Sequence, residues 1–339
     1  MEVRRKSSVV LPVNATDSSH IGHARRQAMA MASAMGFSEL TLGELAIIVT
    51  EAAANITAHA TQGEIVLSSW QFRGDSGIDV LALDNGRGIA DIGRSFQDGY
   101  STAGTAGQGL GAMFRLSSAL QIYSLPDKGT ALFARVVAES PSANSTAADY
   151  SLGAISTPMN GETACGDAWS AAHSAGRSLY MVADGLGHGP SAAVAAQEAI
   201  RIFEESSHLT PTQILSNAHG ALAKTRGAAV SVAEINYDKR LLNYAGVGNI
   251  AGSILHDGKT RSMISMNGTL GHTIGKIQQF SYPWETNSSL IMHSDGLSTR
   301  WSLDQFPGLA TRHPALLAGV LYRDFCRRRD DVTILVTRI

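Results

Sequence analysis

The sequence predicts a chain of mixed α/β (α+β) class that folds as two domains, and three observations lead to this prediction. The chain has 339 residues, which is more than a single hydrophobic core usually serves. Residues 139–148 are rich in Ser, Ala, Asn and Thr, the composition of a linker. Helix-type and strand-type patterns alternate before this stretch, whereas short apolar runs separated by turn residues dominate after it. We therefore expect one domain over residues 1–138 and a second over residues 149–339.

The composition narrows the class of function. The formal net charge is −2, so the chain lacks the basic surface of a protein that binds nucleic acid or anionic membranes. The two cysteines, Cys165 and Cys326, are far apart in the sequence and indicate a reducing compartment rather than a disulfide framework. No apolar run approaches the ~20 residues of a membrane span, and the run at residues 9–11 is too short for a secretory signal. We expect a cytoplasmic protein with neither a nucleic-acid nor a membrane partner.

The N-terminal domain is expected to open with a strand over residues 7–13, followed by an Ala- and Met-rich helix that Asp17 caps and Gly36 ends. A second helix is predicted from the capping box at residues 41–44, after which apolar residues recur at helical spacing. On this helix Glu51 and Asn55 are four residues apart, so they share a face that is not the apolar stripe. By spacing alone they fit a solvated helix face, and a functional pair requires support from elsewhere in the chain.

Two glycine-bearing stretches supply that support. Residues 78–83 form a strand-type run that ends in Asp84-Asn85-Gly86-Arg87-Gly88-Ile89, where a carboxylate can bond an exocyclic amine and glycines leave room for a flat base. The stretch from Gly104 to Gly111 precedes a helix from about Ala112 and offers backbone N–H groups to phosphates. Taken alone, such a run can equally be a flexible loop. No strand precedes it, so it is not the dinucleotide fingerprint of a Rossmann fold.

The second domain is predicted to contain antiparallel sheets flanked by helices. Helices are expected over residues 190–206, 211–226 and 316–329. Strands are expected over residues 178–183, 228–236, 241–245, 252–256, 262–266, 289–293 and 332–339. The arginines near the end of the last helix, Arg323 among them, are interpreted as a solvated basic face.

Aspartates recur where these strands begin or end. Asp184 follows the strand-type run 178–183 and is followed by Gly185, and Asp295-Gly296 repeats this arrangement after residues 289–293. Asp167 follows the region of Ile155, and Asp330 stands before the last strand-type segment. One Asp-Gly is more often plain turn chemistry, but four such positions give hard oxygen ligands that suit a pair of Mg²⁺ or Mn²⁺ ions better than zinc.

Five blocks of this domain resemble the metal-dependent serine/threonine phosphatases of the SpoIIE and RsbX type. These blocks are residues 165–167, 183–189, 245–250, 294–297 and 330–333, and they cover the chain from about residue 150 to its end. The resemblance implies a β-sandwich that holds two Mn²⁺ or Mg²⁺ ions and hydrolyses phosphoserine or phosphothreonine through metal-activated water. It implies that Asp184 is catalytic and bridges the ions, with the Gly185 carbonyl on one ion and Asp295 and Asp330 on the other. Asp167 would complete the site directly or through water, and Asp331 stays open as an alternative to Asp330.

Three further residues near these blocks are interpreted as structural. His188 and His293 are possible acids, but a histidine in a tight turn often bonds local backbone. Cys165 has no accompanying motif of a cysteine nucleophile, so we expect a buried thiol without a chemical role.

The N-terminal domain resembles the GHKL ATP-binding fold, a Bergerat-type α/β sandwich, and within it the RsbT and RsbW group of anti-sigma serine kinases. The resemblance rests on residues 50–60, on residues 84–89, on residues 97–111 and on Gly129-Thr130. It implies that Asn55 holds the Mg²⁺ of ATP, that Asp84 binds the adenine amine and that Glu51 acts as the base toward a substrate hydroxyl. The remaining nucleotide-binding residues implied by the resemblance are Gly86, Gly88, Gly104, Gly107, Gly109, Leu110, Gly111 and Thr130.

Together the two resemblances predict a bifunctional regulator of a partner-switching stress response, an ATP-dependent serine/threonine kinase joined to a serine/threonine phosphatase. The implied partners are STAS-domain anti-sigma antagonists or stressosome-type proteins, and a homodimer is possible. The alternative is a phosphatase whose N-terminal domain senses nucleotide or sequesters a partner without transferring phosphate. A phosphatase domain that has lost catalysis is disfavoured because all the expected carboxylates are present.

Overall fold

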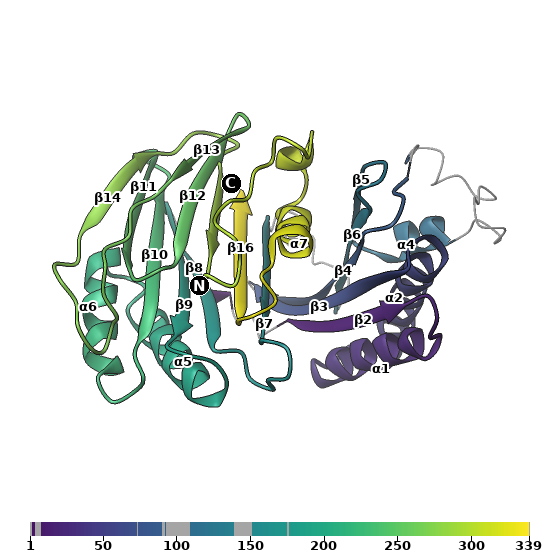
Figure 1. Ribbon diagram of the computed structural model, residues 1–339, viewed down its shortest axis with the longest axis horizontal. Coiled ribbons are helices and arrows are strands. Elements are labelled where there is room, and N and C mark those ends of the chain that lie inside the picture. Colours follow the sequence, from purple (N-terminus) through teal and green to yellow (C-terminus); the bar gives the residue numbers. More distant parts are fainter. Residues whose placement is uncertain are drawn as a thin grey trace. The chain divides into compact units, whose positions relative to one another are not determined.

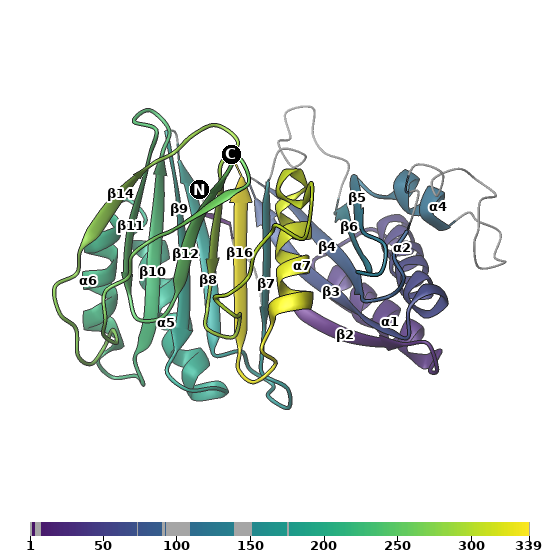
Figure 2. The same ribbon diagram turned by 45° about the horizontal axis from the view of Figure 1, so that its top comes forward.

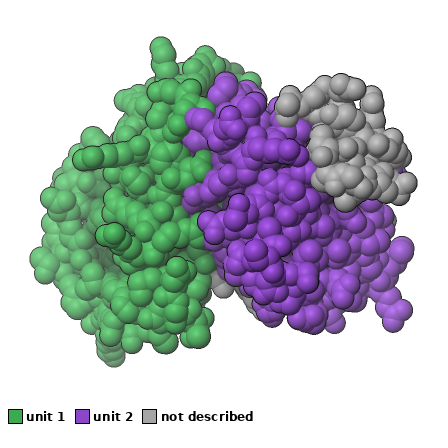
Figure 3. Space-filling view, turned by 45° about the vertical axis from the view of Figure 1, so that its right-hand side comes forward, with its two compact units in different colours: residues 1–7, 151–305, 324–339 green, residues 8–150, 306–323 purple. Residues whose placement is uncertain are grey.

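The computed structural model describes residues 2–3, 8–72, 74–89, 92, 109–138, 151–174 and 176–338. The chain forms two compact units (Figure 3). The C-terminal unit consists of Met1–Ser7, Ser151–Gln305 and Asp324–Ile339, and the N-terminal unit consists of Ser8–Tyr150 and Phe306–Arg323. Two segments thus belong to a different unit from the one that their position in the sequence suggests. The expected linker at residues 139–148 lies outside the described residues.

The N-terminal unit is built on one antiparallel sheet with strand order β2-β3-β4-β6-β5. The helices α1 and α2 cover one face of this sheet (Figure 1). The strands are β2 (Val9–Asn14), β3 (Gln62–Phe72), β4 (Asp75–Asp84), β5 (Ala119–Ser124) and β6 (Thr130–Val137). The helices are α1 (Ser19–Ala34), α2 (Glu39–His59) and α4 (Gly109–Leu116), and α7 (Pro314–Phe325) contributes residues 314–323 to this unit.

Strand β4 is buried on both of its faces. Ile78, Val80 and Ala82 join the core beneath α1 and α2. The alternate residues Leu81 and Leu83 point to the other face, because successive side chains of a strand alternate. Covering both faces accounts for the nearly continuous apolar run that predicted this strand.

The ends of the first two helices agree with the sequence prediction only in part. Asp17 Oδ1 accepts the N–H of Ser19 at the start of α1, and Gly36 after its end has φ +80°, the left-handed conformation expected of a terminating glycine. The predicted start of α2 is wrong by about three residues. Ser38 is the N-cap and its hydroxyl accepts the N–H of Thr41, so Thr41 lies inside the first turn.

The long apolar helix α2 also corrects the expectation that no segment reaches the length of a membrane span. Among the described residues it is the one helix that is long and apolar enough for this by length and composition. Its buried residues lie in the core of the N-terminal unit, as in the central helix of a globular domain. These residues are Leu45, Ile48, Val49, Ala52, Ala53 and Ile56.

The C-terminal unit is a sandwich of two antiparallel sheets (Figures 1 and 2). One sheet has strand order β1-β8-β9-β10-β11-β14, and α5 (Pro190–Glu205) and α6 (Pro211–Leu222) pack on it through a shared apolar core. Its strands are β1 (Glu2–Val3), β8 (Asp167–Ser174), β9 (Arg177–Gly185), β10 (Ala228–Asn236), β11 (Leu241–Val247) and β14 (Gln279–Pro283). The other sheet has order β13-β12-β15-β16-β7, with β7 (Leu152–Thr157), β12 (Ala251–His256), β13 (Lys259–Ser262), β15 (Ser289–His293) and β16 (Val332–Arg338).

The predicted fold class is confirmed, and most of the predicted strands and helices of the C-terminal unit are found. The strand predicted over residues 262–266 is wrong, since β13 ends at Ser262. Strands β1, β7, β8 and β14 were not predicted, and β1 is too short to carry a pattern of its own. The last helix begins at Pro314 and ends at Phe325, which is earlier than predicted at both ends.

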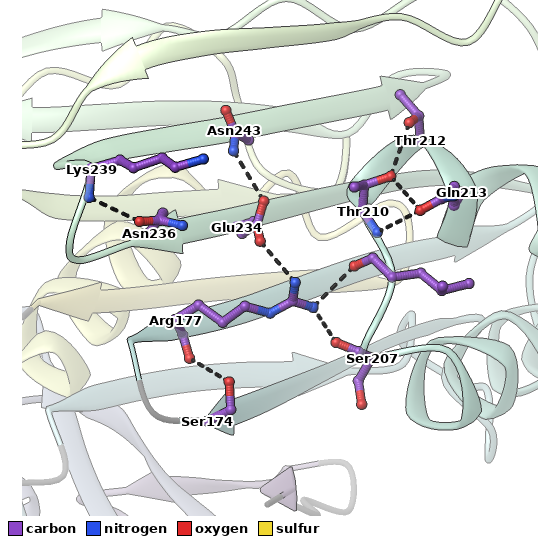
Figure 4. A network of polar contacts seen from close by, with 11 residues as sticks. Ser174, Arg177, Ser207, Thr210, Thr212, Gln213, Glu234, Asn236, Lys239 and Asn243 are labelled. Carbon is purple, nitrogen blue, oxygen red and sulfur yellow. Dashed lines mark hydrogen bonds and ion pairs between the residues drawn. The ribbon is translucent and has the colours of Figure 1, made fainter.

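A polar network attaches the turn between α5 and α6 to the six-stranded sheet (Figure 4). Arg177 on β9 forms an ion pair with Glu234 on β10 at 3.0 Å, and its Nη2 donates to the carbonyls of Ser207 and Leu209. Asn243 on β11 donates to the second oxygen of Glu234 at 3.0 Å. The guanidinium therefore holds both helices in place on the sheet that carries Asp184.

Candidate active sites

Four loop or strand ends bring the predicted carboxylates of the C-terminal unit together. Asp167 at the start of β8 is the cross-strand partner of Asp184 near the end of β9. In the other sheet, the end of β15 is paired with the beginning of β16, where His293 opposes Ile334. Asp295 follows β15 by two residues and Asp330 precedes β16 by two residues, so this antiparallel pairing places them at the same edge.

Ser294 and Thr333 join the two sheets at this point. The Ser294 hydroxyl donates to Asp167 Oδ2 at 2.6 Å and accepts the N–H of Thr333 at 2.9 Å. The other carboxylate oxygen of Asp167, Oδ1, is buried and has no hydrogen-bond partner among the residues that the structure describes. A buried carboxylate oxygen without a donor is costly, and a cation in its vicinity would remove that cost.

The carboxylates perturb one another electrostatically. Burial, followed by the charges of Asp295, Asp330 and Asp331, raises the pKa of Asp184 to about 7. Burial and then the charge of Asp184 raise the pKa of Asp167 well above its usual value, and burial and then Asp330 raise that of Asp295. Mutual repulsion of this kind is typical of a site that is made to hold positive charge.

The two adjacent aspartates that the sequence left open differ in burial and in hydrogen bonding. Asp331 is buried, and its two oxygens accept the N–H groups of Met159 and Gly166 at 2.8 and 2.9 Å. Asp330 is exposed, and its Oδ1 accepts the N–H of Asp331. This arrangement favours Asp330 as the metal ligand and Asp331 as the residue that orders the loops around Asp167.

The donors around Asp184 fit hard divalent cations. Carboxylate oxygens from separate strand ends and a backbone carbonyl at Gly185 are the ligands that Mg²⁺ and Mn²⁺ prefer. Within the described part of the chain, no group of three or more His, Cys, Asp or Glu side chains is arranged so that it could hold an ion as it stands. The Asn249 side chain donates from Nδ2 to Asp295 Oδ2 at 2.7 Å.

Two neighbours of the cluster have structural roles, as expected. His293 is buried, with Nδ1 bonded to the Ser294 carbonyl and Nε2 accepting the indole N–H of Trp301, and burial lowers its pKa. The pKa of the Cys165 thiol is raised, first by burial and then by Asp167, so the thiolate is disfavoured. His188 differs, because it is exposed and its Nδ1 forms a hydrogen bond with Glu162 Oε1 at 2.7 Å.

The N-terminal unit places Glu51 and Asn55 on the same half-exposed side of α2, away from its buried stripe. The start of α4 lies directly against Glu51. A Cβ at Gly109 would lie 2.3 Å from Glu51 Oε2, so any larger residue here would displace the end of the Glu51 side chain. The described part of the glycine-rich stretch thus meets the proposed base, and α4 begins at Gly109 rather than near residue 112 as predicted.

Asp84 lies at the end of β4 and is almost fully buried. Its Oδ1 accepts the N–H of Gly86 at 2.8 Å and the N–H of Thr130 at 3.3 Å, and among the described residues no donor is bonded to Oδ2. Burial raises the pKa of Asp84, and these two N–H groups, followed by the Arg323 guanidinium, oppose that shift. A carboxylate held by one oxygen with the other available suits an exocyclic amine.

The remaining predicted nucleotide contacts are partly described. Gly88 lies in the turn after β4 with φ +72°, and Leu110 and Gly111 lie in the first turn of α4. Gly104 and Gly107 lie outside the described residues, as does the rest of residues 97–108.

Comparison with known proteins assigns both halves of the chain. The sequence matches the family described as histidine kinase-like ATPase domain over residues 13–136 and the family described as stage II sporulation protein E (SpoIIE) over residues 174–339. It is 33% identical over 107 residues to the serine/threonine-protein kinase RsbT of Bacillus subtilis, covering 32% of this chain and 80% of that protein. It also aligns with a solved structure from work on the bacterial stressosome, described as a modular system adapted to control secondary messenger signalling. The TM-score is 0.52 and the identity 30%, and the alignment covers 56% of this chain and 98% of the other. The chain belongs to the histidine kinase-like ATPase family and to the SpoIIE family.

A further relative supports the assignment of the SpoIIE-type domain. The phosphoserine phosphatase RsbX of Bacillus subtilis is 29% identical over 140 residues, which is 41% of this chain and 70% of that protein. The resemblance inferred from sequence motifs is therefore confirmed for both domains.

Sequence reasoning missed several residues that organise the SpoIIE-type and ATPase domains. Ser294, Thr333 and Asn249 lie inside the motif blocks, and their polar character next to the aspartates was the available signal. Arg323 was interpreted as part of a solvated face, but its Nη1 donates to the backbone carbonyl of Asp84 at 2.9 Å. No local pattern relates two residues 239 positions apart, so this contact could not be found from the sequence.

Proposed function

We propose that this protein is a bifunctional partner-switching regulator, with an ATP-dependent serine/threonine kinase activity in its ATPase domain and a phosphoserine/phosphothreonine phosphatase activity in its SpoIIE-type domain. The observation that carries the proposal is the presence of two separate candidate sites. One joins Asp167, Asp184, Asp295 and Asp330, and in the other Glu51, on the same helix face as Asn55, meets the start of α4 at Gly109.

In the phosphatase, Asp184 is the central residue because its pKa responds to Asp295, Asp330 and Asp331 together. Asp184, Asp295, Asp330 and the Gly185 carbonyl would hold two Mn²⁺ or Mg²⁺ ions, with Asp167 contributing directly or through water. Bound there, such ions supply an activated water and stabilise the charge that develops on phosphorus. Ser294 holds the Asp167 carboxylate in one orientation, and Asp331 fixes the loops at Met159 and Gly166.

In the kinase, the residues of the ATPase domain position the nucleotide and the attacking hydroxyl, which is most of what phosphoryl transfer requires. Asp84 would accept the adenine amine on Oδ2, and Gly86, Gly88 and Thr130 would line the base. Asn55 would hold the Mg²⁺ of ATP, while Gly104, Gly107, Gly109, Leu110 and Gly111 would cover the phosphates. Glu51 would orient and deprotonate a substrate serine or threonine hydroxyl.

The proposed partners are STAS-domain anti-sigma antagonists or stressosome-type proteins in the cytoplasm. The RsbT and RsbX relatives, a kinase and a phosphatase by name, support a substrate that is phosphorylated and dephosphorylated on serine or threonine. Because free action of both activities on one residue would only consume ATP, we expect either distinct substrate residues or control of one activity.

The decisive experiment uses an Asp184→Asn variant, in which phosphate placed on a partner is not removed. This variant is incubated with Mg-ATP and a candidate STAS-domain protein from the same genome, and the intact mass of the partner is recorded. We expect the gain of one phosphoryl group and no gain when Glu51→Ala is added. A parallel incubation of the wild-type chain with the phosphorylated partner and Mn²⁺ should remove that group.

The same experiment distinguishes a second candidate function, a phosphatase whose ATPase domain only senses nucleotide or sequesters a partner. That function predicts nucleotide binding without any mass gain on the partner. Absence of both nucleotide binding and metal-dependent phosphate release would refute both functions.

A further inference from the structure

The segment Phe306–Arg323, which we call the α7 segment, belongs to the ATPase unit although the chain encodes it between Asp295 and Asp330 of the phosphatase site. Three contacts attach its first half to the edge of the ATPase sheet. The Tyr123 hydroxyl donates to the Pro307 carbonyl at 3.2 Å, and the His313 N–H donates to Gln121 Oε1 at 2.9 Å. The His313 ring stacks on Phe133 with ring centres 4.1 Å apart.

The ATPase sheet has a face that matches this segment. Leu81 and Leu83 on β4 point away from α1 and α2, and the backbone of α7 lies against them at Gly319. A Cβ at Gly319 would lie 3.0 Å from Leu83 Cδ2, so the helix and the strand are in close contact. All residues from Pro314 to Tyr322 are buried. The α7 segment is therefore a buried segment that packs on this face of the ATPase sheet.

The segment ends at the proposed adenine site. Arg323 Nη1 donates to the main-chain carbonyl of Asp84 at 2.9 Å. The Asp84 side chain accepts the N–H groups of Gly86 and Thr130. Hydrogen bonds therefore fix both the main chain and the carboxylate of Asp84. Loss of the Arg323 contact would remove one of the hydrogen bonds that position the main chain of Asp84, which is also paired with Gly63 on β3.

After Arg323, the chain enters the C-terminal unit and leads to the phosphatase site. Helix α7 extends to Phe325, whose carbonyl accepts the N–H of Ser298 at 3.0 Å. The main-chain N–H of Arg327 donates to the Gly296 carbonyl at 2.8 Å. Leu297 and Cys326 form an isolated antiparallel β-bridge. The residues that follow Arg323 are therefore bonded to the loop that carries Asp295, and they lead within a few residues to Asp330.

We propose that Arg323 is a positioning residue of the nucleotide site, and that the α7 segment couples nucleotide binding at Asp84 to the phosphatase loops that carry Asp295 and Asp330. The inference rests on the proposed function, because it requires that the ATPase domain binds nucleotide and that the second domain hydrolyses phosphate esters. Coupling of this kind is reciprocal. If one position of the segment favours nucleotide binding by a given free energy, bound nucleotide stabilises that position by the same free energy.

The test compares the full-length wild-type chain with three variants, and it uses a fluorescent ADP analogue with Mg²⁺ as the nucleotide probe. Arg323→Ala should weaken binding of this probe about tenfold, because a charge-assisted hydrogen bond that holds Asp84 is lost. Arg323→Lys keeps a cationic donor and should recover most of the affinity. Arg312→Ala removes an exposed arginine of the same segment and should leave the affinity unchanged.

Coupling is measured as the effect of saturating ADP on Mn²⁺-dependent hydrolysis of p-nitrophenyl phosphate. We expect ADP to change the rate of the wild-type chain and of Arg312→Ala at least about twofold, and to leave the rate of Arg323→Ala unchanged. A general loss of structure would instead lower the rate with and without ADP, and a thermal melt identifies it. Hydrogen exchange of the wild-type chain, which needs no variant, should show slower exchange in residues 314–331 when ADP is bound.

The outcomes separate this inference from the proposed function. If the wild-type chain binds the probe but ADP changes neither its hydrolysis rate nor the hydrogen exchange of residues 314–331, the coupling is refuted. The proposed kinase and phosphatase activities are not affected by that result. If Arg323→Ala is folded and binds the probe as tightly as the wild type does, the positioning role is refuted. If the wild-type chain binds no nucleotide, both the inference and the kinase proposal fall.

Discussion

The buried ion pair between Asp79 and Arg135 gives the sharpest test of how the ATPase sheet is stabilised. The two residues are direct cross-strand partners on β4 and β6, and their side chains are 3% and 2% exposed. Arg135 donates from Nε to Asp79 Oδ1 at 2.7 Å and from Nη2 to Oδ2 at 2.9 Å, and the indole N–H of Trp70 donates to Oδ1 at 3.0 Å. They lie on the same sheet face as Leu81, the face that the α7 segment covers.

Replacing Asp79 with leucine leaves the Arg135 guanidinium buried without the carboxylate that faces it. Hydrogen bonds to charged groups contribute about 1.5–3 kcal/mol each, and the two from Arg135 are lost together with the one from Trp70. Breaking a buried ion pair on one side typically costs about 3–5 kcal/mol, so we expect a loss of about 4 kcal/mol in the free energy of unfolding. Most domains are stable by only about 5–15 kcal/mol, so this loss should be visible as early unfolding of the ATPase unit.

The assay is urea denaturation of the full chain followed by circular dichroism, for Asp79→Leu, Arg135→Met and the double variant. The double variant should recover at least about 2 kcal/mol relative to Asp79→Leu, because no buried charge then remains unpaired. Arg201→Met is the matched control. Arg201 also has three hydrogen bonds to carboxylates, but its side chain is 50% exposed and we expect a barely measurable change. Equal destabilisation by Arg135→Met and Arg201→Met would contradict the reasoning, since burial would then not decide the effect.

Three further predictions concern the SpoIIE-type domain. Asp184→Asn should lower Mn²⁺-dependent hydrolysis of p-nitrophenyl phosphate by more than about a hundredfold while the circular dichroism spectrum is unchanged, and a variant with near wild-type rate would remove Asp184 from the site. The pKa of Asp184 is raised to about 7, and a metal ligand must be deprotonated. The affinity for Mn²⁺, measured by calorimetry, should therefore fall up to about tenfold per pH unit below pH 7 and be constant above it. An affinity that does not change between about pH 5 and 7 would contradict this prediction. Arg177→Ala should lower the free energy of unfolding by about 2–3 kcal/mol, because the buried Glu234 loses its ion pair. Arg177→Lys should lower the free energy of unfolding by less. A thermal melt that is unchanged in both variants would show that the network does not stabilise the domain.

The sequence was sufficient to predict the fold class, most strands and helices, and both families. Strand β10 has the predicted bounds because turn residues stand at both ends of its apolar run and the length of the run suits a strand. Glu51 and Asn55 share a helix face because the helical period dictates it. Errors occurred where local signals compete, as at the start of α2, where both Ser38 and Thr41 can cap a helix and only Ser38 does.

What the sequence determined by itself was thus local: which segments form helices or strands, and which residue types stand at their ends. Tertiary structure alone decided which of these residues meet. Pairing of β15 with β16 and of β8 with β9 brought Ser294 to Asp167 across 127 positions, and it gave Asp331 a structural role distinct from that of Asp330. The α7 segment joined the ATPase unit because Leu81 and Leu83 left an apolar sheet face that had to be covered, and this placed Arg323 on Asp84. Burial of apolar surface is non-directional and depends on area, so the partner that covers a given face is chosen in three dimensions and leaves no period or spacing in the chain.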